Sequence, residues 1–94
     1  MAEPTFTLRL LSPDGTTEEH DTVAVVAPGE MGYLGILAHH APLVTTLAAG
    51  RLVWRGPDQQ SHQREVPGGL LEVRKNIVTI MTGAIGAPAG GTSR

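Results

Sequence analysis

Turn-forming residues divide this chain into short apolar segments at intervals of about eight to twelve residues, the spacing of an all-β domain. Within the first segment, Phe6, Leu8 and Leu10 occupy alternate positions, as in a strand with one buried face. No segment shows the apolar spacing of three and four residues that an amphipathic helix needs. We therefore expect a fold of short strands with essentially no helix.

Three hairpins are predicted from pairs of strand-like segments that flank a turn. Further strands are expected over 22–27, 34–37 and 43–47, and Pro28 and Gly29 are expected to end the first of these before an exposed glycine-rich loop over 29–35. Together these short strands predict a two-sheet antiparallel β-sandwich. The predicted hairpins join 6–10 to 16–21, 52–55 to 59–66, and 70–74 to 77–81.

The chain has 94 residues, which is enough to enclose one hydrophobic core. We expect a single domain over 1–84. Residues 85–94 are rich in Gly, Ala and Pro and poor in large side chains, so we expect them to form a flexible tail.

Composition excludes several kinds of partner. The net charge of -2 argues against nucleic-acid binding, and the absence of cysteine excludes disulfides and thiolate metal sites. No apolar stretch reaches the roughly 18 residues of a membrane span, so we expect no direct membrane insertion. The first residues lack the basic start and apolar run of a secretion signal.

No group of residues predicts catalysis, a cofactor or a metal. The glycines over 29–35 lack the helix start and Lys-Ser or Lys-Thr pair of a phosphate loop. His39 and His40 are adjacent, so an extended backbone would point them to opposite faces; we expect instead that a histidine ring nitrogen bonds the backbone beside Pro42. Ser61 and His62 are neighbours in a predicted strand, so their side chains would diverge, which argues against a catalytic pair.

Three motifs resemble the epsilon subunit of F-type ATP synthases, whose mitochondrial counterpart is called delta. The resemblance covers about residues 6–84, and the motifs occur in the order and with a spacing similar to the family's. They are VVAPGEMGYLGIL at 25–37, HAPLVT at 40–45, and GGLLEV at 68–73 followed by NIVTI at 76–80.

The resemblance implies a β-sandwich that acts as a non-catalytic central-stalk subunit, attaches the gamma subunit to the c-ring and couples rotation to ATP synthesis. The coupling ion would be a proton or sodium. The complex would be peripheral to the cytoplasmic face of a bacterial inner membrane. By position, the c-ring-contact loop would comprise Glu30, Met31, Gly32 and Tyr33, with His40 nearby; the gamma-contact or core positions would be Leu70, Leu71 and Val73.

Two departures from the family affect this expectation. Many relatives carry an acidic residue at the position of Tyr33, so here the contact would depend on the phenol or on Glu30. Relatives also continue into a helical hairpin that inhibits ATP hydrolysis, and without it we expect little or no such inhibition. The alternatives are a free-standing β-sandwich that binds protein or carbohydrate, and a small hydrolase built on Ser61 and His62.

Overall fold

A computed structural model of the chain describes residues 3–83. The predicted tail over 85–94 lies outside the described residues. Within them the chain forms nine strands and no helix, which confirms the all-β class; it contains no helix long and apolar enough to cross a membrane. The strands are β1 (Phe6–Leu11), β2 (Thr17–Thr22), β3 (Ala24–Gly29), β4 (Gly32–Leu37), β5 (Leu43–Leu47), β6 (Gly50–Arg55), β7 (Ser61–Val66), β8 (Gly69–Arg74) and β9 (Ile77–Thr82).

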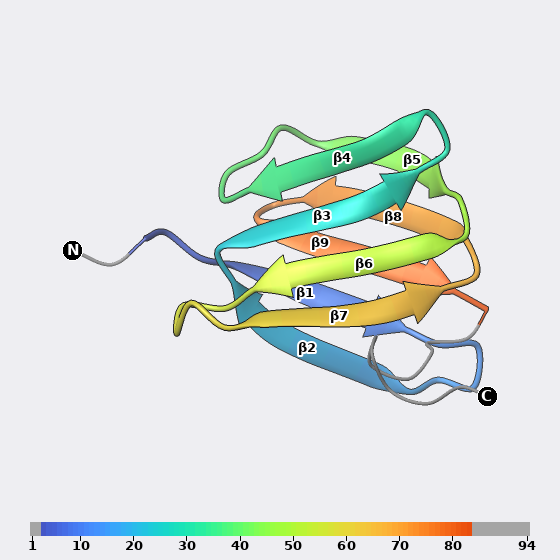
Figure 1. The fold of residues 1–94 in the computed structure, drawn as a ribbon, viewed down its shortest axis with the longest axis horizontal. Helices are drawn as coiled ribbons and strands as arrows, with labels where there is room; N and C mark the ends of the chain where they lie inside the picture. The colour runs from blue at the N-terminus through green and yellow to red at the C-terminus, as the bar shows by residue number, and fades with distance from the viewer. Residues whose placement is uncertain (1–2, 84–94) are drawn as a thin grey trace.

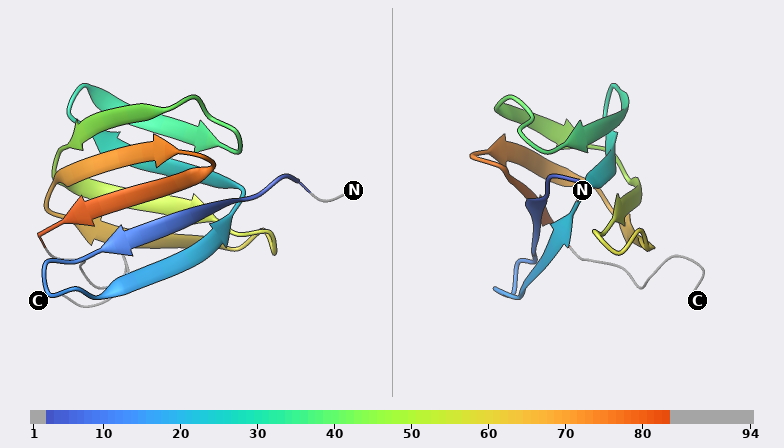
Figure 2. Two further views of the ribbon diagram at one scale, coloured as in Figure 1. Left: turned by 180° about the vertical axis from the view of Figure 1, so that it is seen from behind. Right: turned by 90° about the vertical axis from the view of Figure 1, so that its left-hand side faces the viewer.

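The strands form one continuous sheet that curls into two layers (Figure 1). One layer contains β4, β3, β6 and β7, and the other contains β5, β8, β9, β1 and β2. The layers join where Gly29 of β3 pairs with Leu47 of β5. The view from behind in Figure 2 shows the second layer with β5 at one edge and β2 at the other. This arrangement confirms the predicted sandwich, with the two layers belonging to one curled sheet.

All three predicted hairpins are present, as β1–β2, β6–β7 and β8–β9. In the last, Lys75 and Asn76 have φ values of 53° and 64°, which is the backbone of a type I′ turn. In the first, the Asp14 carboxylate accepts a hydrogen bond from the N–H of Thr16 at 2.8 Å. That bond lowers the pKa of Asp14, because it stabilises the charged form.

Two sequence-based predictions about β3 and β4 are wrong. Strand β3 continues through Pro28 and Gly29, and residues 32–35 belong to β4 instead of a loop. Pro28 has no N–H to donate, and none is needed here because the pairing of β3 with β6 ends at Val26. Beyond that point the Pro28 carbonyl accepts the N–H of Ala48 at 2.8 Å.

One pairing departs from the antiparallel pattern: β1 and β9, near the two ends of the chain, are parallel neighbours, with Leu8 opposite Val78. Both residues are buried, at 0% and 1% exposure, so the pairing brings distant parts of the sequence into one core. Each fully buried aliphatic side chain contributes about 1.5–3 kcal/mol to folding. The core comprises Phe6, Leu8, Leu10, Val25, Ala27, Ile36, Leu47, Leu52, Trp54, Val66, Leu71, Val73, Val78 and Ile80.

Side chains connect the two edge strands β2 and β7. Glu18 of β2 accepts a hydrogen bond from Arg64 of β7 at 2.8 Å and contacts His20 at 2.6 Å. The rings of His20 and His62 lie 4.9 and 5.5 Å from the Trp54 ring, and the Arg64 guanidinium lies 5.2 Å from it. We call these five residues the β2–β7 seam. They hold together two edges that share no backbone pairing.

Candidate interaction surface at the β3–β4 turn

The turn between β3 and β4 and the start of β4 contain the residues that the family resemblance implied as a contact loop. Gly29 and Gly32 are paired, so only Glu30 and Met31 form the turn itself. Gly32 has a φ of 127°, a conformation that strongly favours glycine. Met31 is fully exposed and Tyr33 is 63% exposed. We call Glu30, Met31, Gly32 and Tyr33 the β3–β4 turn surface.

Glu30 is held in place by the neighbouring strand β5. The hydroxyl of Thr46 donates to Glu30 Oε1 at 2.7 Å, and the N–H of Glu30 donates to the Thr46 carbonyl at 3.3 Å. The carboxylate therefore has a defined position while its residue stays exposed. A fixed negative charge at this end of the molecule suits a basic or hydrogen-bond-donating partner.

Tyr33 is also fixed by its neighbours. Its hydroxyl accepts the N–H of Arg51 at 3.4 Å. A Cβ placed on Gly50 would lie 3.1 Å from that hydroxyl and 2.8 Å from Pro28 Cβ, so glycine at position 50 gives the ring the space it occupies. Tyrosine combines an apolar ring with a polar end, and here it presents both at low entropic cost to a partner. Thr46, Gly50 and Arg51 were not predicted as site residues, since nothing local in the sequence links them to this turn.

His40 does not lie near the β3–β4 turn surface, in contrast to the expectation from sequence. The six residues of β4 separate them, a length of about 20 Å at roughly 3.3 Å per strand residue. His40 Nδ1 instead bonds the carbonyl of Ala41 at 2.7 Å, which confirms the predicted role of a histidine at the backbone beside Pro42. His40 belongs to the opposite end of the sandwich.

The three positions expected to contact gamma or to fill the core divide into two groups. Leu71 and Val73 are 0% and 3% exposed and belong to the core. Leu70 is only partly buried, because it faces outward and pairs with Met81. Together with Leu11 it lines a shallow apolar hollow on the outer face of the second layer. Because side chains alternate between the two faces of a strand, Leu70 faces outward while Leu71 and Val73 face the core.

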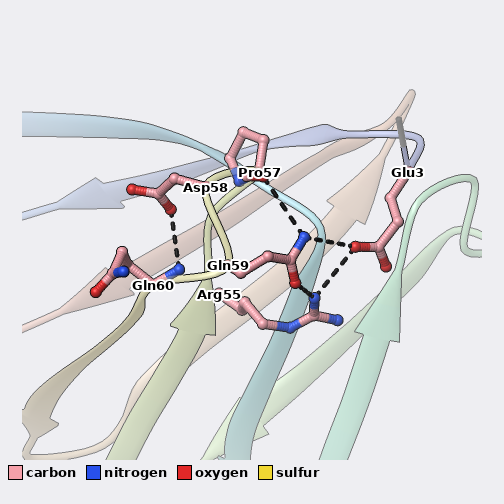
Figure 3. A network of polar contacts seen from close by, with 6 residues as sticks. All are labelled: Glu3, Arg55, Pro57, Asp58, Gln59 and Gln60. Atoms are coloured by element: carbon pink, nitrogen blue, oxygen red, sulfur yellow. Dashed lines mark hydrogen bonds and ion pairs between the residues drawn. The ribbon is translucent and has the colours of Figure 1, made fainter. Parts of the chain in front are cut away.

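A polar network lies at the end of the sandwich where His40 is found (Figure 3). The Glu3 carboxylate accepts hydrogen bonds from Gln59 Nε2 at 3.0 Å and from Arg55 at 3.2 Å, and Arg55 also bonds Gln59. The bond from Gln59, followed by that from Arg55, lowers the pKa of Glu3. This exposed network ties the start of the chain to the β6–β7 turn and contains no nucleophile.

The remaining chemical candidates have structural roles in the described part of the chain. His62 stacks on Trp54 within the β2–β7 seam, and no hydrogen bond joins it to Ser61 there. His39 has a φ of 65°, and its N–H donates to Asn76 Oδ1 at 2.7 Å. Within residues 3–83, no three His, Cys, Asp or Glu side chains are close enough to hold a metal ion.

Comparison with known proteins assigns the family. Residues 5–87 match the model of the ATP synthase delta/epsilon chain β-sandwich domain. The chain belongs to this family. Members of the delta/epsilon family among its relatives include the ATP synthase epsilon chains of Moorella thermoacetica, 36% identical over 74 residues, and of Nostoc punctiforme, 41% identical over 78 residues. These alignments cover 79% and 82% of this chain, but 55% and 57% of the relatives, so the chain spans little more than half of their length.

Two solved structures contain a chain with a similar fold. A chain from the Euglena gracilis mitochondrial ATP synthase, in a structure of OSCP, F1 and c-ring, has a TM-score of 0.85 at 23% identity and aligns with 99% of this chain and 59% of its own. A chain from the central stalk and c-ring of the Tetrahymena thermophila mitochondrial ATP synthase has a TM-score of 0.72 at 18% identity, covering 90% of this chain and 68% of its own. At these identities the likeness concerns the fold alone.

Proposed function

We propose that this chain is the sandwich part of a central-stalk subunit of an F-type ATP synthase, and that it couples rotation to ATP synthesis without an active site of its own. The observation that carries the proposal is the family match over residues 5–87. The two structural neighbours come from assemblies whose titles name F1, the central stalk and the c-ring. The chain would therefore be peripheral to the membrane, on the cytoplasmic face of a bacterial inner membrane, with gamma and the c-ring as partners.

The β3–β4 turn surface is the part that we assign to the c-ring. It combines an exposed methionine, a phenol fixed by Arg51 and a carboxylate fixed by Thr46. Preorganised polar and aromatic groups lose little entropy on binding, so they favour a contact that has to persist during rotation. His40 does not belong to this contact, because β4 separates it from the turn.

Gamma is assigned to the outer face of the second layer. Leu70 and the hollow beside it expose apolar area there, whereas Leu71 and Val73 point into the core and are excluded from any contact. The alternative of a free-standing binding module shares the fold but does not account for the family match.

The test is ATP-driven ion pumping by the complete ATP synthase in membrane vesicles, measured together with ATP hydrolysis. We expect the double variant Glu30→Lys, Tyr33→Ala to lower the pumping per ATP hydrolysed by about threefold or more, since it reverses the fixed charge and removes the fixed phenol. Gln60→Glu is the matched control, because it changes charge in an exposed turn at the other end of the molecule.

Unchanged pumping per ATP in the double variant would contradict the assignment of the turn. Normal assembly and coupling of the synthase in cells that lack this chain would contradict the proposed function itself and favour the free-standing module.

A further inference from the structure

The outer face of the second layer carries two hollows beside each other. The row of side chains that lines the apolar hollow across β1, β9 and β8 is Leu11, Met81 and Leu70. The adjacent row on the same three strands lines a second hollow and consists of Arg9, Thr79 and Glu72. Two residues along a strand span about 7 Å, and the view from behind in Figure 2 shows β1, β9 and β8 side by side. The two hollows are therefore neighbours on one surface.

The second hollow has a surplus of positive charge. Its volume is about 230 Å³, and its lining contains three cationic side chains and one carboxylate. The Arg9 guanidinium also pairs with Glu19 at 2.9 Å, which still leaves three positive charges against two negative ones. The chain as a whole has a net charge of -2, so this site differs in sign from the rest of the molecule. We call it the basic hollow; it is lined by Arg9, Glu72, Arg74, Lys75, Ile77 and Thr79.

Hydrogen-bond donors outnumber acceptors in the basic hollow. Arg74 and Lys75 are exposed, and in the described part of the chain no ion pair involves either of them. Arg9 bonds Glu19 through Nε, so its two terminal nitrogens remain as donors. Glu72 supplies the one carboxylate of the lining. An arginine next to a lysine suits an anionic acceptor, and the fork of a guanidinium matches a carboxylate.

We propose that the basic hollow binds a carboxylate side chain of the gamma subunit. The inference rests on the proposed function, which assigns gamma to this face through the adjacent apolar hollow. A segment of gamma that fills both hollows carries an aspartate or glutamate about 7 Å from an apolar side chain, the separation of two residues on one face of a strand. The charge of the hollow thus specifies a class of side chain on gamma, which the apolar hollow alone does not.

The two hollows contribute differently to this contact. Burial of apolar area around Leu70 favours binding at any ionic strength. The ion pair in the basic hollow forms at exposed side chains, so salt screens it, and it contributes mainly to the orientation and specificity of the contact. Binding is therefore expected to lose its charge-dependent part as the salt concentration rises.

Lys75 permits a direct test, because it is the only lysine of the chain. A carbodiimide joins a primary amine to a carboxylate in contact with it; an amide bond forms, and the carbodiimide takes up the water and becomes a urea. With the complete 94-residue chain bound to F1 particles, we expect Lys75 to be linked to an aspartate or glutamate of gamma, as read by mass spectrometry of the linked peptides. Lys75→Arg keeps the positive charge but has no primary amine, so it should bind F1 as tightly as the parent chain and form no such link.

A second measurement separates the charge from the apolar area. We expect Arg74→Gln to weaken binding of the chain to F1 about fivefold at roughly 50 mM salt and by less than about twofold at roughly 500 mM. Gln60→Glu is the control, since it changes the net charge by the same amount in an exposed turn and should leave binding unchanged. Leu70→Ser should weaken binding at both salt concentrations, because it removes apolar area.

Circular dichroism verifies that each variant is folded, and Lys75→Gln replaces Arg74→Gln should the latter unfold. The carboxylate site is overturned if the bound parent chain forms no link from Lys75 to gamma, or if the charge variant binds as tightly as the parent at low salt. In that case weaker binding by Leu70→Ser shows that gamma still contacts this face, and the proposed function stands. A parent chain that does not bind F1 at all overturns both the carboxylate site and the proposed function.

Discussion

At the scale of single residues, Asn76 holds together three parts of the chain. Its side chain accepts the N–H of His39 at 2.7 Å and donates to the Thr5 carbonyl at 2.9 Å, while its own carbonyl accepts the N–H of Thr7 at 3.2 Å. Its φ of 64° is one that asparagine tolerates better than most residues. One side chain thus connects the β8–β9 turn, the start of β1 and the β4–β5 loop.

We expect Asn76→Ala to lower the free energy of unfolding by about 2–4 kcal/mol, because it removes two hydrogen bonds and places alanine at positive φ. Asn76→Gly removes the same bonds without the backbone strain, so we expect a smaller loss of about 1–2 kcal/mol. Urea unfolding followed by the fluorescence of Trp54 measures both. Equal losses in the two variants would show that the backbone conformation contributes nothing.

At the scale of elements, the β2–β7 seam closes the open side of the curled sheet. The two strands share no pairing, yet Glu18 and Arg64 connect them at 2.8 Å, and Arg64 also covers the ring of Trp54. The Arg64 side chain is 20% exposed, whereas that of Arg9 in its ion pair with Glu19 is 37% exposed. Ion pairs that are shielded from water contribute more than exposed ones.

We therefore expect Arg64→Ala to lower the free energy of unfolding by about 1–2 kcal/mol, through the lost ion pair and the lost contact with Trp54. Arg9→Ala, which removes an ion pair within the β1–β2 hairpin, should cost no more than about 0.5 kcal/mol. Trp54 is the single tryptophan, so a red shift of its emission in Arg64→Ala would report entry of water into the seam. Similar costs for the two variants would contradict a special role of the seam.

At the scale of the whole molecule, β1 and β9, the first and last strands of the described residues, are neighbours in one sheet. β1 completes its pairings only when β9 arrives from about 70 residues away, and the two strands lie in parallel. Pairing of such distant segments loses the conformational entropy of a long loop before any favourable contact forms. The last strand is therefore as necessary to the core as the first.

This topology predicts slow folding. We expect refolding in the millisecond-to-second range, as for other all-β domains that depend on distant pairings. Stopped-flow dilution from urea, followed by Trp54 fluorescence, measures the rate. Folding within microseconds would mean that local hairpins form the core without the β1–β9 pairing.

The all-β class, the three hairpins and most of the strands could be predicted from the sequence, because alternation and turn chemistry act between near neighbours. The extent of β3 and the start of β4 could not, because Pro28 and Gly32 are accommodated by the order of the strands in the sheet. A motif of consecutive residues also indicated the segment from Glu30 to Tyr33 as the candidate contact loop. Three relations become visible only in the folded chain: β1 pairs in parallel with β9, His40 lies a strand's length from Tyr33, and Thr46 and Arg51 fix the two polar groups of the turn. Those relations depend on how distant strands are ordered in the sheet, and residues that meet in this way leave no mark on each other's local sequence.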